Sequence, residues 1–383
     1  MKTLDVGESA ALNAQQFDLD KSLEDYLLLV LSDSNLPTGG FVASSGLESW
    51  LQHGYSSIAE PPSRTGSATE RPQLSAAPPL PTAPDGPINA FISQSLHSYA
   101  RLNLPLVRQA HAAVTRMPFG TSEETESSSR VVETAFASIL AVDILCETMT
   151  LNHVARRASV AQGVALLTLY DRAFAPPIGS SEAARDEATI RLVSRYRNAV
   201  KTAENGCNGH MGVAFGVLTA AIGVGIGALQ FPFLPPWPSS SSNSVLTSRW
   251  RTRHAAESAL HLFLFLHARS LLSSAVRMNS IGPYLAHRML VNDTRHMISA
   301  ALQKTAPIRP PKIATDEAEV ASAGTDEPPA EGGDWWDDDL EWRPTWEAGA
   351  QEARLHGSPA TSWPLGEVVA SRHDQLFSKV FNS

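Results

Sequence analysis

Apolar residues recur at helical spacing along most of the chain, beginning with Leu23, Leu27, Leu28 and Leu31. Residues three and four positions apart share one face of a helix, so this run predicts a helix. It stops at Asn35 and Pro37, because proline cannot continue a helix interior. Gly39 and Gly40 then permit a tight backbone turn, and a second helix is predicted over residues 41–55.

The rest of the chain repeats this pattern, and no segment alternates apolar and polar residues as a β-strand does. Pro105 is expected to break one helix, since it lacks a backbone N–H. We therefore predict an all-α fold, a single helical bundle domain over residues 23–303. Its further helices are expected at residues 88–102, a short segment ending near 117, and residues 131–153, 156–174, 182–204, 211–233, 249–279 and 283–302.

Segments poor in large apolar residues separate these helices, and they are too polar to offset the entropy of ordering. Residues 1–22 are predicted to be a flexible N-terminus, and residues 304–362 an acidic, disordered linker with a Trp-Asp cluster at 335–339. Low-complexity inserts are predicted at residues 56–87, 118–130 and 232–248.

Helical periodicity returns in residues 363–383, where Leu376, Phe377, Val380 and Phe381 form an apolar stripe. A terminal helix with such a stripe has to bury it against its own body or against a partner. We therefore predict a C-terminal docking tail.

Residues 211–233 are almost wholly apolar and long enough to cross a bilayer. A single-span membrane protein is thus one alternative. No cluster of Lys or Arg flanks the run closely, and glycine-rich helices also occupy the centres of helical domains, so we favour a buried core helix. Gly223, Gly225 and Ala228 match a loose dinucleotide fingerprint but lack the strand-then-helix context that it needs.

Composition narrows the choice of partners. The net charge is −9 and the pI is near 5.7, which argues against a chain that binds nucleic acid. Two cysteines, Cys146 and Cys207, cannot form a disulfide scaffold, and no signal peptide opens the chain. We therefore expect a cytoplasmic protein.

Candidate chemistry is sparse. The chain has no phosphate-binding Gly-x-x-x-x-Gly-Lys-Ser/Thr loop and no His-Glu-x-x-His zinc motif. His254, Glu257 and His261 would share one helix face and could bind a divalent ion in a metal-dependent hydrolase, although three nearby arginines oppose a cation. Cys207 and His210 stand at chelating spacing, but one such pair leaves coordination incomplete and a helix-entry turn explains it better.

Four separated segments, in the same order, resemble the urease accessory protein UreF family. Departures from the family pattern are Met211 for Phe or Leu, Gly212 for Pro, and Asp374 for Glu. The matching segments are Leu36-Pro37-Thr38-Gly39-Gly40-Phe41 with Gly46-Leu47-Glu48; His210-Met211-Gly212-Val213-Ala214-Phe215-Gly216; Ala275-Val276-Arg277-Met278 with Ile281-Gly282; and Glu367 with residues 372–383, similar to a His-Glu-x-Leu-x-x-x-Leu-Phe-x-Ser ending.

The resemblance implies a non-enzymatic, all-α maturation factor that dimerises. It would bind a UreD/UreH-type accessory protein and recruit a UreG-type GTPase to the urease apoprotein. Nickel would be handled by the complex, with no cofactor bound directly to this chain. Carried over to this sequence, the partner-binding residues would be Leu36, Pro37, Gly39, Gly40, Phe41, Gly46, Glu48, Arg277, Gly282, His373, Leu376, Phe377 and Phe381.

Two hypotheses follow from this assignment. The segment from Leu36 to Glu48 is expected to face the GTPase or to shape the surface on which the GTPase docks, with Glu48 as a candidate polar contact. The tail from Trp363 onward is expected to order against the UreD/UreH-type partner.

Overall fold

The computed structural model describes residues 22–33, 36–54, 86–117, 125–176, 187–225, 256–308 and 358–382, without the side chains of 125–128 and 256–257. Helices dominate these residues and no β-strand occurs among them, which confirms the all-α prediction. The first helix covers residues 22–31.

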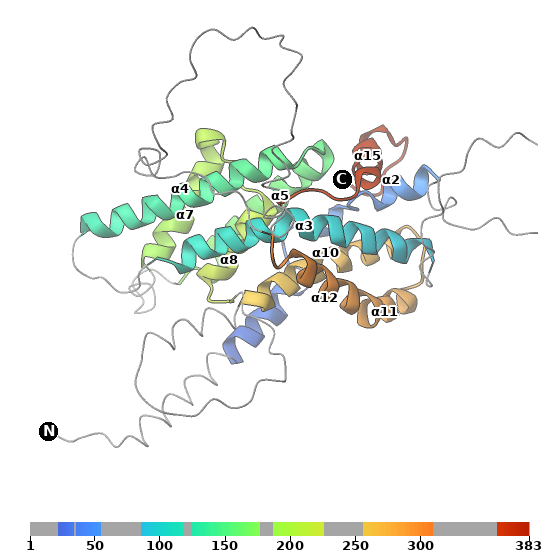
Figure 1. Ribbon diagram of the computed structural model, residues 1–383, viewed down its shortest axis with the longest axis horizontal. Helices are drawn as coiled ribbons and strands as arrows, with labels where there is room; N and C mark the ends of the chain where they lie inside the picture. The colour runs from blue at the N-terminus through green and yellow to red at the C-terminus, as the bar shows by residue number, and fades with distance from the viewer. Residues whose placement is uncertain are drawn as a thin grey trace, which may run out of the picture.

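Helix α3 (Pro87–Thr115) lies through the middle of the body, and four other helices pack along it (Figure 1). These are α4 (Thr125–Met149), α8 (Met211–Ala221), α10 (Ala256–Arg277) and α12 (Asp293–Thr305). Leu96, Leu104 and Leu106 of α3 are fully buried in the resulting core. Burial of this apolar face stabilises the bundle by about 25 cal/mol for each Å² removed from water.

Glycines allow α8 to approach its neighbours closely. A Cβ on Gly216 would lie 2.6 Å from the carbonyl oxygen of Val107 in α3. A Cβ on Gly163 of α5 (His153–Leu169) would lie 2.0 Å from the carbonyl oxygen of Gly209. No side chain fits at these two crossings, so the glycines of this region serve helix packing.

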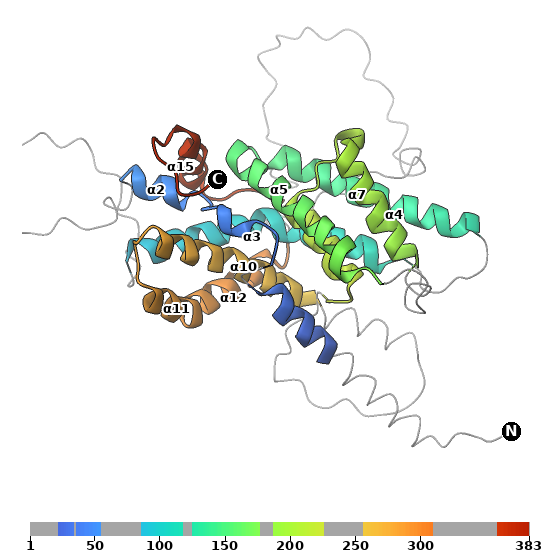
Figure 2. The ribbon, with the colours of Figure 1, turned by 180° about the vertical axis from the view of Figure 1, so that it is seen from behind.

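The remaining elements complete the two ends of the body, as Figure 2 shows from behind. Helix α7 (Glu187–Thr202) packs on α4 at one end, and α11 (Pro283–Val291) packs on α10 and α12 at the other. Helix α15 (Pro364–Ser371) lies on α2 (Leu47–Gln52) and α5. Single turns are η1 (Gly40–Val42), η3 (Tyr170–Phe174), η4 (Glu204–Gly206) and η5 (Arg372–Gln375).

The predicted break at Pro105 is wrong, because α3 continues through it. An interior proline costs a helix about 3 kcal/mol through one lost hydrogen bond and a steric clash. Pro105 is itself buried between the fully buried Leu104 and Leu106, and packing against the neighbouring helices outweighs that cost.

The apolar run at 211–233 forms a shorter helix than predicted. Helix α8 ends at Ala221, and Gly223 adopts a φ of +77°, which ends the helical path. Eleven residues span about 16 Å, too short to cross a bilayer. Another segment, Ser258–Arg277 in α10, is long and apolar enough to span, but 56% of it is buried inside the protein, as in a core helix.

Several predicted boundaries also need correction. Helix α4 begins at Thr125, so the last six residues of the predicted insert 118–130 are helical. The helix predicted over 131–153 ends at Met149, and the Asn152 side chain caps α5 by accepting the N–H groups of Val154 and Ala155. The segment 283–302 divides at Asn292 into α11 and α12, which extends to Thr305 and into the predicted linker.

The helices within residues 41–55 and 363–383 are shorter than predicted. Gly46, with a φ of +85°, delays the start of α2 until Leu47. In the tail, which we define as residues 358–382, α15 ends at Ser371 and the chain is non-helical after Gln375. Inserts 56–85 and 232–248 lie outside the described residues, as do residues 1–21 and 309–357.

Candidate functional site

The segment from Leu36 to Trp50, called the corner below, is held against α10 by hydrogen bonds to its backbone. Ser270 donates from Oγ to the carbonyl oxygen of Gly40 at 3.1 Å, and Arg277 donates to that of Phe41. The Arg277 guanidinium lies 5.8 Å from the Phe41 ring and 5.9 Å from the Phe381 ring, within cation–π range. Three of the predicted partner-binding residues therefore meet at one place.

The tail folds back onto the corner of its own chain. Ser49 donates from Oγ to the carbonyl oxygen of Val369 at 2.6 Å. A Cβ on Gly46 would lie 2.8 Å from that of Ala370, so glycine is needed for this contact as well as for its positive φ. Trp363 packs edge-on against Phe91 of α3, with ring centroids 5.0 Å apart. The tail thus packs on its own body, one of the two surfaces against which its apolar stripe was expected to be buried, and its contact with the UreD/UreH-type partner stays a prediction.

Glu48 is the centre of this contact. Its fully buried carboxylate accepts the backbone N–H of Val380 at 2.6 Å and that of Phe381 at 3.1 Å. It also accepts His373 Nε2–H and Gln52 Nε2–H, each at 3.1 Å. Four donors satisfy the two oxygens, so Glu48 holds the tail in place and has no surface left for a partner. Its predicted role as a polar contact for the GTPase would require the tail to leave the corner, and it stays a prediction.

A second clamp lies at the surface, around Asp374. Arg157 of α5 donates to both carboxylate oxygens, at 2.9 and 3.2 Å, and His153 contacts one of them at 3.2 Å. The hydrogen bonds from Arg157 are the main reason that the pKa of Asp374 falls well below its usual range. Lys379 adds a third basic group at 3.6 Å. These exposed pairs fix the orientation of the tail more than they stabilise it.

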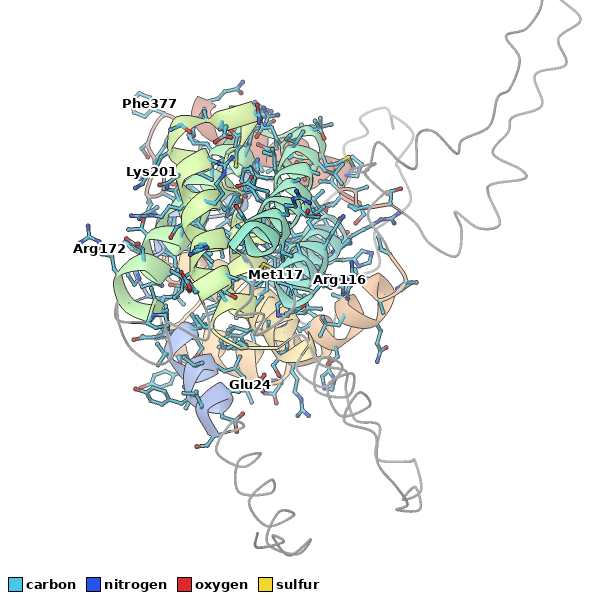
Figure 3. All side chains as sticks on the ribbon, turned by 90° about the vertical axis from the view of Figure 1, so that its left-hand side faces the viewer. Glu24, Arg116, Met117, Arg172, Lys201 and Phe377 are labelled. Carbon is cyan, nitrogen blue, oxygen red and sulfur yellow. The ribbon has the colours of Figure 1, made fainter. Side chains whose placement is uncertain are left out.

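The other predicted partner-binding residues divide by exposure. Gly46 of the corner and His373, Leu376 and Phe381 of the tail are buried. Phe377 is fully exposed and points away from the body (Figure 3). Leu36, Gly39 and Gly40 are partly buried, and the exposed residues are Pro37, Phe41, Arg277, Gly282 and Phe377.

A cavity of about 280 Å³ lies between the corner, the tail and helices α3, α5 and α10. In its wall His267 stacks on Tyr99, with ring centroids 3.9 Å apart, and contacts Ser95 Oγ at 3.1 Å. Serine beside histidine can form a nucleophile with its base. Burial lowers the pKa of His267 to about 3, however, which makes this imidazole a poor base. The pair is therefore suited to packing and not to hydrolysis.

Two histidines held neutral by burial should make the fold sensitive to acid. Burial lowers the pKa of His111 to about 4, and its Nε2–H donates to the Val224 carbonyl oxygen. Because unfolded histidine titrates near 6.5, the unfolded chain takes up protons first as the pH falls. The free energy of unfolding therefore has its full value above pH 6.5. It falls progressively as the pH is lowered from 6.5 to the folded-state pKa values of the two histidines. At pH 5 each of His111 and His267 should lower the free energy of unfolding by about 2 kcal/mol relative to its value at neutral pH.

The test is urea unfolding at pH 7.5 and pH 5 for the wild type and His111→Gln, whose amide can still donate to Val224. The variant should lose about 2 kcal/mol less than the wild type over this interval. An equal loss in both proteins would show that His111 does not titrate in this window.

Cys207 and His210 lie at the entry to α8, in a network that leaves no open metal position. The His210 ring contacts Glu147 at 2.8 Å through Nε2 and Ser159 at 3.2 Å through Nδ1, so both nitrogens are engaged. Burial and the nearby Asp143 raise the pKa of the Cys207 thiol to about 12. A metal ion would have to displace these contacts, and the arrangement is that of a helix-entry turn.

The other predicted metal group is incomplete in the structure. His254 and the side chain of Glu257 lie outside the described residues, and His261 is exposed on α10. Within the described part of the chain, no three His, Cys, Asp or Glu residues are grouped to hold a metal ion.

Sequence reasoning missed the residues that hold the site together. Asp143 of α4 accepts three successive backbone N–H groups, from Asn208, Gly209 and His210. Arg157 and Ser49 reach the tail from distant parts of the chain. A carboxylate within an apolar helix is the one signal that pointed to Asp143, whereas Arg157 and Ser49 look like ordinary polar positions.

Comparison with known proteins places the chain in a family. The UreF family model matches residues 87–240, from the start of α3 to beyond α8. The urease accessory protein 6 of Cryptococcus neoformans var. grubii is 33% identical over 372 residues, which cover 94% of this chain and 97% of the relative. Similarity at this level over nearly both whole lengths is decisive: the chain belongs to the UreF family of urease accessory proteins.

Proposed function

We propose that this protein is a non-enzymatic scaffold for urease maturation. It recruits a UreG-type GTPase to a UreD/UreH-type chaperone and to the urease apoprotein, so that the complex inserts nickel. The observation that carries this proposal is the full-length similarity to a urease accessory protein. The absence of a phosphate-binding loop from the sequence fits a role in which a separate chain hydrolyses the nucleotide.

The joined corner and tail are the surface that we assign to partners. Phe41 is 54% exposed, Val380 is 64% exposed and Phe377 is fully exposed. Exposed aromatic residues on a fixed backbone are typical anchors of protein interfaces. In this proposal the tail contacts the UreD/UreH-type chaperone, and the exposed part of the corner, around Pro37 and Phe41, faces the GTPase. The scaffold acts in the cytoplasm as a homodimer.

Phe377→Ala should weaken capture of the chaperone without affecting the fold. Phe377 has no contact to lose in the free chain, so its stability should stay within about 0.5 kcal/mol of the wild type. Loss of a buried aromatic anchor from an interface typically costs at least 2 kcal/mol, or about thirtyfold in affinity. The measurement is binding of the purified chaperone by titration calorimetry, together with urease activation in cells that lack the native gene.

The matched control is Tyr26→Ala, which removes another exposed aromatic residue, on the first helix, far from the tail in the sequence. Wild-type affinity in Phe377→Ala would remove the tail from the interface.

The proposal as a whole rests on a broader test, a pull-down from urease-producing cells. Recovery of neither the GTPase nor the chaperone with the full chain would overturn the scaffold role.

A further inference from the structure

The negative charge of this protein is concentrated in one segment. Residues 309–357 contain thirteen Asp and Glu and four Lys and Arg, a net charge of −9. The remaining 26 acidic residues are balanced by 26 basic ones, so the rest of the chain is neutral overall. Within the segment, Asp334-Trp335-Trp336-Asp337-Asp338-Asp339-Leu340-Glu341-Trp342 combines five acids with three tryptophans. We call residues 334–342 the acidic Trp motif.

Helix α11 presents a surface with the opposite character. Tyr284 is 92% exposed and Val291 is 68% exposed, while His287 and Arg288 lie between them at helical spacing on the same side. We call these four residues the α11 face. The opposite side of the helix is held in the core by Ala286 and Met289. The face is therefore a firmly supported surface of aromatic, aliphatic and basic groups that is not covered by the described residues.

The surroundings reinforce this positive character. From Pro283 to Thr305 the chain has a single acid, Asp293, while Arg295, His296 and Lys304 are exposed on α12. Figures 1 and 2 both show α11 and α12 along the edge of the body opposite α15 and α2. The α11 face is thus separate from the surface that we assigned to urease partners.

We propose that the acidic Trp motif of the same chain docks on the α11 face. Its carboxylates would pair with Arg288, and its tryptophans would pack on Tyr284 and Val291 and stack on the guanidinium. A net charge of −9 opposite a face with almost no acid favours this occupant over an uncharged one.

The length of the connecting chain permits this contact. The motif begins 26 residues after Ile308, which follows α12 directly. A random-coil chain of 26 residues would have a root-mean-square span of roughly 30 Å. The 13 residues of α12 cover about 20 Å back to α11. Tethering raises the local concentration of the motif to about the millimolar range, so a contact with a Kd near 100 μM would be mostly occupied.

A competition experiment tests the proposal. A fluorescent peptide of residues 331–347 is titrated with the full wild-type chain and with the variant Trp335→Ala/Trp336→Ala/Trp342→Ala, whose own motif is disabled. The triple variant should bind the peptide about tenfold more tightly than the wild type, because the wild-type face is already occupied. Adding Arg288→Glu to the triple variant should weaken peptide binding at least fivefold, and raising the salt concentration should weaken it further.

The matched control is Arg172→Glu added to the triple variant. Arg172 is exposed at the end of the body formed by α4 and α7 (Figure 3), and its reversal changes the net charge equally. Three results would overturn the proposal: equal peptide affinity of the wild type and the triple variant, no peptide binding by either, or an equal effect of Arg172→Glu and Arg288→Glu. Equal affinity of the wild type and the triple variant would mean that the motif binds another protein instead of this face. Equal effects of the two charge reversals would mean that the peptide responds only to the net charge of the protein.

Discussion

Glu48→Ala should detach the tail from the corner and lower the free energy of unfolding by about 3–5 kcal/mol. The substitution removes the acceptor of two backbone N–H groups, at Val380 and Phe381, and leaves the buried His373 without its partner. A donor that is buried without an acceptor keeps its full desolvation cost. Urea unfolding followed by circular dichroism measures the loss, and amide exchange at residues 380–382 should accelerate by about two orders of magnitude.

The matched control is Glu133→Ala. Glu133 is half exposed and contacts Arg195 at 3.3 Å, so its removal should cost less than about 1 kcal/mol. Glu48→Gln should fall between the two, because the amide keeps the size of the side chain but replaces one acceptor oxygen with a donor. Wild-type exchange rates at residues 380–382 in Glu48→Ala would show that apolar packing alone holds the tail. Urease activation should fall with the tail, through loss of the surface that carries Phe377.

Asp143→Ala should destabilise the other end of the body by a similar amount, about 3–5 kcal/mol. The fully buried carboxylate accepts the N–H groups of Asn208, Gly209 and His210 at 2.6, 3.0 and 2.8 Å, and the Tyr196 hydroxyl at 3.2 Å. These bonds fix the turn that leads into α8. Without them, four donors face an apolar core with no acceptor.

Thermal and urea unfolding of Asp143→Ala should be compared with Asp171→Ala, which removes a partly exposed ion pair with Arg197 and should cost less than about 1 kcal/mol. Asp143→Asn is a second comparison, because its amide nitrogen would face N–H donors, and it should also be strongly destabilised. Equal stability of the Asp143 and Asp171 variants would show that the turn does not depend on the carboxylate.

The helices of this protein could be predicted because each has a local signal. The spacing of apolar residues placed helices at α5, α7 and α10 to within a few residues at most ends. The ends of these helices depend on single residues, and tertiary packing decides whether such a residue ends the helix. Pro105 continues a helix because neighbouring helices pack on α3 around it. Gly46 delays a helix through its positive φ, and its missing Cβ leaves room for Ala370 of the tail.

The candidate site was harder to predict, because its contacts join residues far apart in the sequence. The family motifs drew attention to Glu48, Arg277, His373 and Phe381, and the fold brings these four residues together. Sequence alone did not show that Glu48 faces inward. A charged residue next to an exposed turn usually belongs to the surface, and only the arrival of the tail encloses it.

The pairing of Glu48 with residues 373–381 also affects the synthesis of the protein. The two parts are separated by 325 to 333 residues. At about 5–20 residues per second, a ribosome needs roughly 15 to 70 seconds to produce the second part after the first has been made. Through that interval the nascent corner has an unmatched carboxylate beside Leu47 and Trp50. Newly made chains should therefore depend on general folding chaperones for that period, and proteolysis during translation should concentrate at the corner.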